Sequence, residues 1–313
     1  MKFLLLDKYN RPLLNLRIAI TPSCNQNCFY CHREGHTGKT NLLSVNEIIR
    51  VVKIATEFGV EDVKITGGEP LMRKDIKAII KGLREIQKLK DISLVTNAKL
   101  LTEDLAFELK EAGLTRINIS LPSLNPIIYR KITGGEINGA LRGVKAAINA
   151  GLTPVKINMV VLKGLNDCEI DSMIEASKKM GVILQLIEFE PINICFEEYA
   201  KYHLPLDNIE EKLRMKAEKI EVRNFMHNRK VYTIDGAKIE VVKPIENTEF
   251  CAHCTRMRLT FDGKLKPCLM RNDNLVDILP YLRSDASDDV LKALFLKANE
   301  LREPFYKETK TIS

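Results

Sequence analysis

Hydrophobic and polar positions along the first 190 residues alternate between two periods, and this pattern predicts strands and helices in regular succession. Short apolar runs typical of strands occur at 16–20, 63–66, 92–96, 116–121, 155–161 and 183–189. Between them, apolar residues recur at helical spacing, as in Ile48, Val51 and Val52 after the capping sequence that begins at Ser44. Glycines such as Gly59 and Gly113 then end the helices.

Six strands joined by helices predict a parallel sheet. Six such units are too few for a closed eight-stranded barrel, so we expect an α/β fold built on a partial (β/α)6 barrel, with its active site at the carboxyl ends of the strands. The alternation stops after Pro191, and apolar runs at 231–234 and 238–242 around Asp235 and Gly236 predict a hairpin. We therefore expect two domains, at 1–225 and at 226–313.

Composition limits the classes of protein that this chain can represent. Its 313 residues are 45% hydrophobic and 28% charged, which excludes a disordered or collagen-like protein. The apolar run 1–6 is too short for an export signal, and no run of about 18 apolar residues predicts a membrane-spanning helix. We expect a cytoplasmic protein without a membrane partner.

The net charge of +7 is compatible with nucleic acid, with an anionic surface or with a phosphorylated small molecule. The chain has no Trp and only 6% aromatic residues, so the stacking surface typical of a nucleic-acid-binding protein is not indicated. A small phosphate ligand is therefore favoured over nucleic acid.

Six of the eight cysteines form two triplets, which in a reducing compartment indicate metal binding or catalysis. Cys24, Cys28 and Cys31 are separated by three and by two residues. Three thiolates would bind three irons of a [4Fe-4S] cluster and leave one iron open to a small molecule. A zinc site completed by His32 or His36 is the alternative, and His32 is otherwise expected to be a polar wall residue.

The second triplet is Cys251, Cys254 and Cys268, and the segment 259–265 predicts a hairpin that would return Cys268 to the other two thiols. A zinc ribbon completed by His253 or by a distant cysteine is the alternative. The remaining two cysteines, Cys168 and Cys195, are predicted to be buried as small hydrophobic residues.

Arg256 and Arg258 lie directly after Cys254 and are two residues apart on a predicted strand, so both side chains are expected on one side. Such a pair suits an anion, although two solvated surface arginines would give the same pattern.

The first triplet with Tyr30 before its last cysteine, together with Gly67-Gly68-Glu69-Pro70 after a strand, resembles the radical S-adenosylmethionine (SAM) enzymes. The resemblance implies that the open iron chelates SAM and that an electron from the cluster cleaves it to a 5′-deoxyadenosyl radical. The two glycines would let the backbone approach the methionine ammonium group, and Glu69 would supply a counter-charge.

Both triplets, with 254–260 and 262–265, resemble over nearly the whole chain the GTP 3′,8-cyclase family, which begins molybdenum cofactor biosynthesis. The resemblance implies a barrel of the radical SAM type and a smaller C-terminal domain with a second [4Fe-4S] cluster that holds guanine. It also implies removal of the ribose C3′ hydrogen of GTP and attack of C3′ on C8, which gives (8S)-3′,8-cyclo-7,8-dihydroguanosine 5′-triphosphate.

Site residues follow from the resemblance position by position. The expected GTP contacts are Arg17, Lys64, Thr96, Lys156, Arg256, Met257 and Arg258, of which Arg256 and Arg258 would orient the substrate. The expected SAM contacts are Tyr30, Gly68, Ser120 and Glu190. Arg17, Lys64 and Lys156 are expected to converge at the mouth of the barrel.

Two departures from the family stand out. Gln185 and Glu190 occupy the region of the sixth strand where the family commonly has an arginine and a methionine, and the chain ends at 309–313 without the Gly-Gly tail of many members. The family also implies a possible homodimer and, as pathway partner, a downstream cyclic pyranopterin monophosphate synthase, while the reductant is not indicated.

Two alternatives belong to other classes. One is a radical SAM maturase that modifies a peptide and carries an auxiliary cluster, and the other is a basic binding module with two structural zinc sites. GTP binding that depends on Arg256 and Arg258 would distinguish the cyclase from the maturase.

Overall fold

All six predicted strands and the helices between them are present in the computed structural model, which describes residues 4–36 and 42–307. The first six strands are β1 (Asn15–Ala19), β2 (Asp62–Thr66), β3 (Asp91–Thr96), β4 (Arg116–Ser120), β5 (Val155–Val161) and β6 (Ile183–Glu188). The helices of this region are α1 (Val45–Glu57), α2 (Ile76–Arg84), α3 (Glu103–Glu111), α4 (Pro126–Thr133), α5 (Ile137–Asn149) and α6 (Ile170–Met180). Neighbouring strands from β1 to β6 pair in parallel, as predicted.

The C-terminal third adds strands at both edges of this sheet. Its strands are β7 (Lys219–Arg223), β8 (Arg229–Ile234), β9 (Ala237–Val242), β10 (Arg256–Leu259), β11 (Lys264–Lys266) and β12 (Val276–Asp277). Its helices are α7 (Phe196–Tyr202), α8 (Asp207–Lys216), α9 (Thr248–Ala252), α10 (Leu279–Arg283) and α11 (Asp288–Glu300). The described strands form one twelve-stranded sheet in the order β12-β11-β10-β1-β2-β3-β4-β5-β6-β9-β8-β7.

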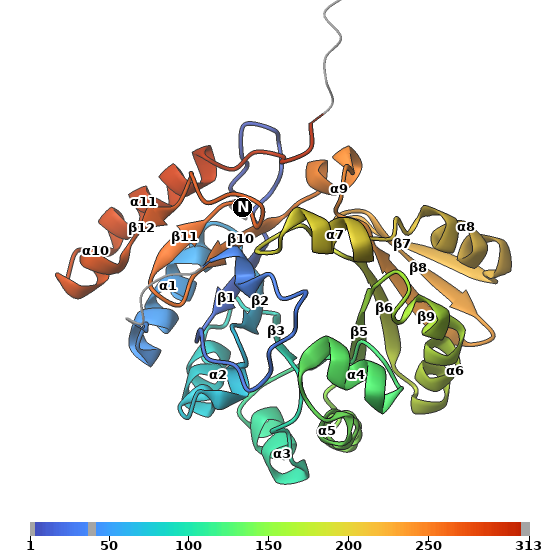
Figure 1. Ribbon diagram of the computed structural model, residues 1–313. Coiled ribbons are helices and arrows are strands. Elements are labelled where there is room, and N and C mark those ends of the chain that lie inside the picture. The colour runs from blue at the N-terminus through green and yellow to red at the C-terminus, as the bar shows by residue number, and fades with distance from the viewer. Residues whose placement is uncertain (1–3, 37–41, 308–313) are drawn as a thin grey trace, which may run out of the picture.

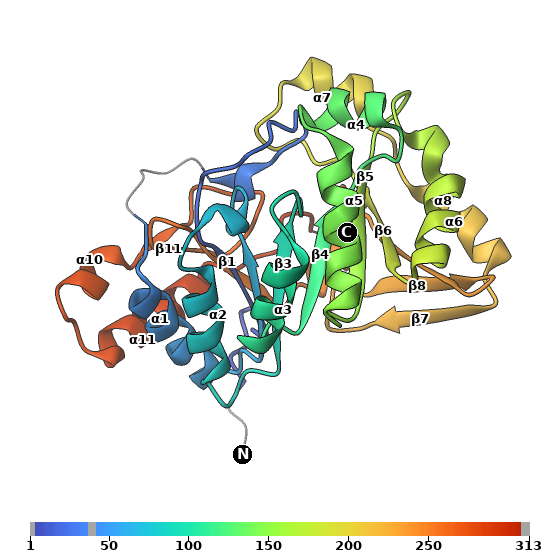
Figure 2. The ribbon, with the colours of Figure 1, turned by 90° about the horizontal axis from the view of Figure 1, so that it is seen from below.

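Both junctions are parallel, because β10 pairs with β1 and β9 pairs with β6. Figure 1 shows the resulting curved sheet with α1 to α6 along its outer side, and Figure 2 shows the molecule from that helix-covered side. The α/β partial barrel with a smaller C-terminal part is therefore confirmed. The boundary between 225 and 226 stays a prediction.

The alternation of side chains along each strand separates the core from the site. Leu16 and Ile18 of β1 are fully buried in the hydrophobic core under the helices, as are Val63 and Ile65 of β2. Arg17 lies between its two apolar neighbours and points to the opposite face of the sheet. The inner face of the curved sheet is thus polar, and it forms the site.

The prediction for Cys168 and Cys195 is wrong, because both side chains are exposed. It followed the general tendency of cysteine toward burial. Cys168 lies in the 3₁₀ turn Asp167–Glu169, and Cys195 directly precedes α7, so both belong to surface segments. The described residues include no helix that is both long and apolar enough to cross a membrane.

Candidate active site

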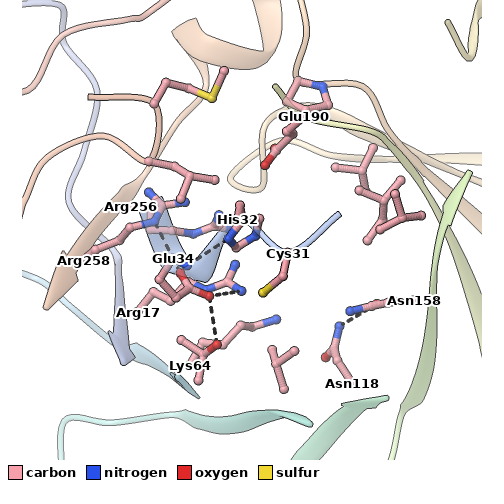
Figure 3. Close-up of a pocket in the computed structure, with 18 of the residues that line it drawn as sticks. Arg17, Cys31, His32, Glu34, Lys64, Asn118, Asn158, Glu190, Arg256 and Arg258 are labelled. Carbon is pink, nitrogen blue, oxygen red and sulfur yellow. Dashed lines mark hydrogen bonds and ion pairs between the residues drawn. The ribbon is translucent and has the colours of Figure 1, made fainter. Parts of the chain in front are cut away.

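A cavity of about 300 Å³ opens on the inner face of the sheet, and its lining includes all six cysteines of the two triplets. Side chains from the inner faces of β10, of β1 to β6 and of β9 form its wall. The close-up in Figure 3 shows the cationic side chains Arg17, Lys64, Arg256 and Arg258 on one side, with Asn118, Asn158 and Glu190 around the rest. Segments far apart in the sequence therefore meet at one site.

Most of the predicted site residues line this cavity. Besides the six cysteines they are Arg17, Tyr30, Lys64, Gly68, Thr96, Ser120, Glu190, Arg256 and Arg258. Arg256 and Arg258 point to the same side of β10, as predicted.

Two predicted residues lie elsewhere. Met257 alternates with the two arginines on β10, so its side chain is fully buried in the hydrophobic core. Lys156, at the start of β5, lies outside the lining and forms a buried ion pair with Glu240. Lys156 therefore does not join Arg17 and Lys64 at the cavity, and a contact of its side chain with GTP would require it to leave Glu240.

The loop that carries the first triplet is held by the turn at 67–70. The backbone N–H of Gly68 donates to the carbonyl of Thr21 at 2.7 Å, and that of Glu69 donates to the carbonyl of Ser23 at 2.7 Å. A Cβ at Gly68 would lie 2.2 Å from the Ser23 carbonyl oxygen. Glycine is thus required here for close packing against the backbone that leads to Cys24, in addition to the expected access for a ligand.

The carboxylate of Glu69 is buried and ties this turn to the end of β3. It accepts hydrogen bonds from the Thr96 hydroxyl at 2.6 Å, from the Asn97 N–H at 2.7 Å and from the Leu71 N–H at 3.0 Å. Burial raises the pKa of Glu69, although these bonds oppose the shift. Its expected role as a counter-charge for the SAM ammonium stays a prediction.

The second triplet is supported from behind by two arginines. The predicted hairpin is present, since β10 pairs with β11 in antiparallel register and carries Cys268 back toward Cys251 and Cys254. Arg11 donates to the carbonyl of Cys251 at 3.0 Å, and Arg302 donates to the carbonyl of Cys254 at 2.8 Å.

The two triplets differ in the electrostatic surroundings of their thiols. Burial raises the pKa of Cys28 to about 12. Burial also opposes ionisation of Cys254, but Arg302, Arg256 and Arg11 outweigh it and lower the pKa of this thiol. Cys254 is therefore the thiol most disposed to carry a negative charge without a metal. Burial raises the pKa of the other two thiols of its triplet, Cys251 and Cys268, as it does in the first triplet.

The six thiols suit clusters better than single ions. All are free of disulfides, and in the described ranges no three His, Cys, Asp or Glu side chains lie close enough to hold one metal ion. Thiolates around a cubane bind different irons and need not converge on one point. His36 pairs with Asp262 at 2.7 Å, and His253 donates from Nδ1 to the Glu249 carbonyl outside the cavity lining, so neither of these two histidines completes a triplet.

The positive side chains that line the cavity are not fully balanced by negative ones. Lys64 and Arg256 make no ion pair or hydrogen bond through their side chains to any residue in 4–36 or 42–307. Burial lowers the pKa of both, well below its usual range for Lys64 and to about 9 for Arg256, and neighbouring cations add to the shift. Two basic side chains held close together without an ion pair to a carboxylate indicate an anionic ligand.

Sequence reasoning missed Glu34, which lies between two of the predicted arginines. Its carboxylate binds Arg17 at 2.8 Å and the Thr66 hydroxyl at 2.9 Å, and it lies 3.9 Å from Arg258 (Figure 3). Burial alone would raise the pKa of Glu34, but Arg17, His32 and Arg258 lower it to about 2. Its position three residues after Cys31 is the sequence feature that could have indicated a place in the site.

Arg229 and Glu240 were also missed. Arg229 lines the cavity, while Glu240 is fully buried beneath it. A charged residue between Ile239 and Val241 in a predicted strand could have indicated that Glu240 faces the inner side.

Comparison with known proteins defines the class first. The model of the Radical SAM superfamily matches residues 18–176, and the model described as Molybdenum Cofactor Synthesis C matches residues 182–308. Among solved structures, SuiB of Streptococcus suis bound to S-adenosylmethionine shares the fold with a TM-score of 0.61 and 18% identity, over 96% of this chain and 66% of that chain. The structure of anSMEcpe with bound AdoMet gives a TM-score of 0.62 and 17% identity, over 95% and 81%. The fold and the first triplet are those of a radical SAM enzyme.

Curated relatives narrow the class. The chain is 49% identical to a probable GTP 3′,8-cyclase of Methanococcus aeolicus, over 96% of this chain and 99% of the relative. It is 46% identical to the protein of the same name in Methanocaldococcus jannaschii and 44% identical to that in Methanothermobacter thermautotrophicus, with coverage of 96% of this chain in both. The chain belongs to the GTP 3′,8-cyclase family of radical SAM enzymes.

Membership of this superfamily implies a [4Fe-4S] cluster and SAM, and the prediction of an enzyme is confirmed. The alternative of a basic module with structural zinc sites is therefore not supported. The peptide-modifying maturase is less supported than the cyclase, because the likeness to SuiB shows only the fold, whereas the curated cyclases match over nearly their full length.

Proposed function

We propose that this protein converts GTP to (8S)-3′,8-cyclo-7,8-dihydroguanosine 5′-triphosphate in molybdenum cofactor biosynthesis. The observation that carries the proposal is the pair of unpartnered cations, Lys64 and Arg256, on the wall of the cavity that both cysteine triplets line. A triphosphate would supply the charge that these side chains lack. Arg17 and Arg258 flank the pair and are held in place by Glu34.

The two triplets divide the cavity into a radical-generating end and a substrate end. When bound at Cys24, Cys28 and Cys31, a [4Fe-4S] cluster and SAM supply the 5′-deoxyadenosyl radical that removes the C3′ hydrogen of GTP. Tyr30, Gly68, Ser120 and Glu190 line the first end and would position SAM. Thr96 also lines the cavity, and its hydroxyl donates to Glu69 at 2.6 Å.

A second [4Fe-4S] cluster at Cys251, Cys254 and Cys268 forms part of the proposal, with its open iron toward guanine. The lowered pKa of Cys254 and the two arginines behind the triplet support thiolate ligation there. Arg256 and Arg258, on the strand that follows, would orient the nucleotide between the clusters.

The wider context of the reaction is proposed from the family. A cyclic pyranopterin monophosphate synthase would consume the product, and an electron donor must reduce the first cluster. A cytoplasmic location and a homodimer agree with the family and remain proposals.

Anaerobic reconstitution tests the function directly. The protein loaded with iron and sulfide is mixed with SAM, dithionite and GTP, and 5′-deoxyadenosine and the GTP isomer are measured by mass spectrometry. We expect both in equal amounts. The double variant R256Q/R258Q should lose the GTP isomer, while Lys230→Gln, on an exposed part of β8, should keep it.

Two results would contradict the proposal in different ways. Formation of 5′-deoxyadenosine with unchanged GTP would keep the radical chemistry and favour the peptide maturase. The proposal of a second cluster would be overturned by a wild type that binds only half of the expected iron, provided that Cys268→Ala keeps this iron and Cys28→Ala loses it.

A further inference from the structure

A buried ionic group lies directly beneath the cavity and has Glu240 at its centre. Glu240 is fully buried on β9, and its carboxylate forms an ion pair with the Lys156 ammonium group of β5. The same carboxylate lies 3.2 Å from an Arg223 nitrogen and 3.3 Å from Arg229 Nε, and it accepts a 2.7 Å hydrogen bond from the Gln185 amide. The single negative charge of Glu240 is thus shared by three cations, so the net charge of the group is positive.

Only one of the three cations reaches the cavity. Arg229 lines it, whereas Lys156 and Arg223 do not. The side chain of Arg229 is 9% exposed, its Nε donates to the Met226 carbonyl at 2.9 Å, and the same nitrogen lies 3.3 Å from the Glu240 carboxylate. Its two terminal nitrogens donate no hydrogen bond within the described parts of the chain. They are therefore free donors on a guanidinium group whose direction is fixed.

A buried guanidinium group needs a partner for its charge. Burial lowers the pKa of Arg229, and although Glu240 opposes this shift, Arg223, Arg116 and Arg17 add to it. Glu240 is shared with two other cations, so it compensates Arg229 only in part. An anion in the cavity would complete the compensation.

Gln185 holds Glu240 in position and links it to Asn118 of β4. Its amide nitrogen donates to Glu240, and its amide oxygen accepts from Asn118 at 3.2 Å. An arginine at this position would bring a fourth cation to the same carboxylate and could not accept the bond from Asn118. Glutamine therefore leaves Glu240 available to Arg229 and ties the acid to β4 and β6.

We propose that Arg229 binds the triphosphate of GTP and that Glu240 is the positioning residue that directs it into the cavity. This inference rests on the proposed function and adds a phosphate contact to it. Lys156 acts through Glu240, because its ammonium group pairs with the acid and lies outside the cavity lining.

Binding measurements separate phosphate contact from structural support. Isothermal titration calorimetry is carried out on the reconstituted holoenzyme without reductant, with GTP and with guanosine, which lacks phosphates. Arg229→Gln should raise the Kd for GTP by about tenfold to a hundredfold, the range of a charge-assisted hydrogen bond, and should change the Kd for guanosine less than about twofold. Arg229→Lys keeps the charge and should recover part of the affinity, and Lys230→Gln should behave as the wild type.

Glu240→Gln keeps the shape of the buried side chain and tests the positioning role. It should raise the Kd for GTP by about tenfold and leave the affinity for guanosine unchanged. Should this variant fail to fold, the pair Arg229→Gln and Arg229→Lys still decides the phosphate contact.

The outcomes distinguish this inference from the function on which it rests. A wild-type holoenzyme that binds no GTP overturns the proposed function. Normal GTP affinity in Arg229→Gln, or equal losses for GTP and guanosine, overturns the phosphate contact alone. Normal GTP affinity in a folded Glu240→Gln overturns the positioning role.

Discussion

Single side chains in the cavity differ chiefly in whether their charge has a partner. Arg17 is bound to Glu34, and Arg258 lies near the same carboxylate, whereas Lys64 stands in the same row of the sheet without an acid. The ligand is therefore expected to change the protonation of Lys64 more than that of its neighbours.

The lowered pKa of Lys64 predicts that GTP binding is coupled to proton uptake. Burial and the nearby cations lower its pKa in the free protein, and a bound triphosphate would raise it again. GTP binding at pH 8 should therefore take up protons, and the uptake should become smaller as the pH falls and the free lysine becomes protonated. Calorimetry in buffers of different ionisation enthalpy measures the uptake, which Lys64→Met should reduce and the exposed variant Lys53→Met should not.

Glu34 gives a prediction about stability. Its pKa is about 2 in the folded protein and about 4.3 when unfolded, so its contribution is present above pH 4.3 and is lost as the pH falls toward 2. The difference corresponds to on the order of 3 kcal/mol. Urea unfolding should show Glu34→Gln less stable than wild type by this order at pH 7, with a smaller difference at pH 3. Equal stability at pH 7, or a loss as large in the exposed control Glu111→Gln, would contradict the role of Glu34.

The direction of a side chain was predicted well where strand alternation determines it. It was predicted less well where an ion-pair partner far along the chain determines it. Arg17 and Arg258 face the cavity because their strand neighbours are apolar. Met257 faces away for the same reason, although the family resemblance places it at the substrate. Lys156 has the inner-face position, but Glu240, 84 residues further along the chain, binds its ammonium group, and no local pattern reveals such a partner.

At the scale of elements, the turn between β2 and α2 sets the place of the first triplet. It bonds to the loop before Cys24 through Gly68 and Glu69, and to the end of β3 through the Glu69 carboxylate. Three segments that line the cavity are thus joined by one short turn.

Gly68→Ala should therefore act on the first cluster. The added Cβ would overlap the carbonyl oxygens of Pro22 and Ser23, which are backbone atoms and cannot rotate away. We expect about half of the wild-type iron after reconstitution, with loss of SAM binding and with GTP binding retained. Gly151→Asn is a matched control, since its φ of +67° is tolerated by asparagine and nothing lies within 4 Å of the added Cβ. Full iron content in Gly68→Ala would contradict this role of the turn.

Elements with one buried face were predictable, and elements without one were not. The helix α1 carries an apolar stripe, and its predicted start after Ser44 and end before Gly59 lie close to its observed bounds. The strand β7 is exposed at nearly every position and lies at the edge of the sheet, so it shows no apolar period. The pairing of β9 and β10 with opposite edges depends on long-range contacts that periodicity does not contain.

At the scale of the whole molecule, Arg302 joins the end of the chain to its beginning and to the second triplet. It is fully buried and donates to the carbonyls of Arg11 at 3.2 Å and Cys254 at 2.8 Å, and it lies 3.7 Å from Asp7. Asn299, near the end of α11, is also buried, and it donates to the Leu6 carbonyl at 2.8 Å and accepts from Arg302 at 3.0 Å. The end of α11 and the segment after it are therefore tied to the N-terminal residues and to the second triplet.

Arg302→Met should destabilise the protein by about 3 kcal/mol, because Asp7 and the carbonyls lose a buried partner. It should also lower the iron bound at the second triplet, since Cys254 loses the cation that most favours its thiolate. Thermal unfolding and iron analysis check the two effects, with the exposed Lys297→Met on the preceding helix α11 as control. Unchanged iron content with reduced stability would limit Arg302 to a purely structural role.

The parallel pairing of β10 with β1 and of β9 with β6 has a consequence for synthesis on the ribosome. Until residues 237–259 have left the ribosome, β1 and β6 both present unpaired backbone groups along open edges. The nascent barrel is then exposed to edge-to-edge association with other chains, although most of its core residues have already been made. Because β9 and β10 are joined by a short segment that includes the first two cysteines of the second triplet, both edges are covered within the same short interval of translation.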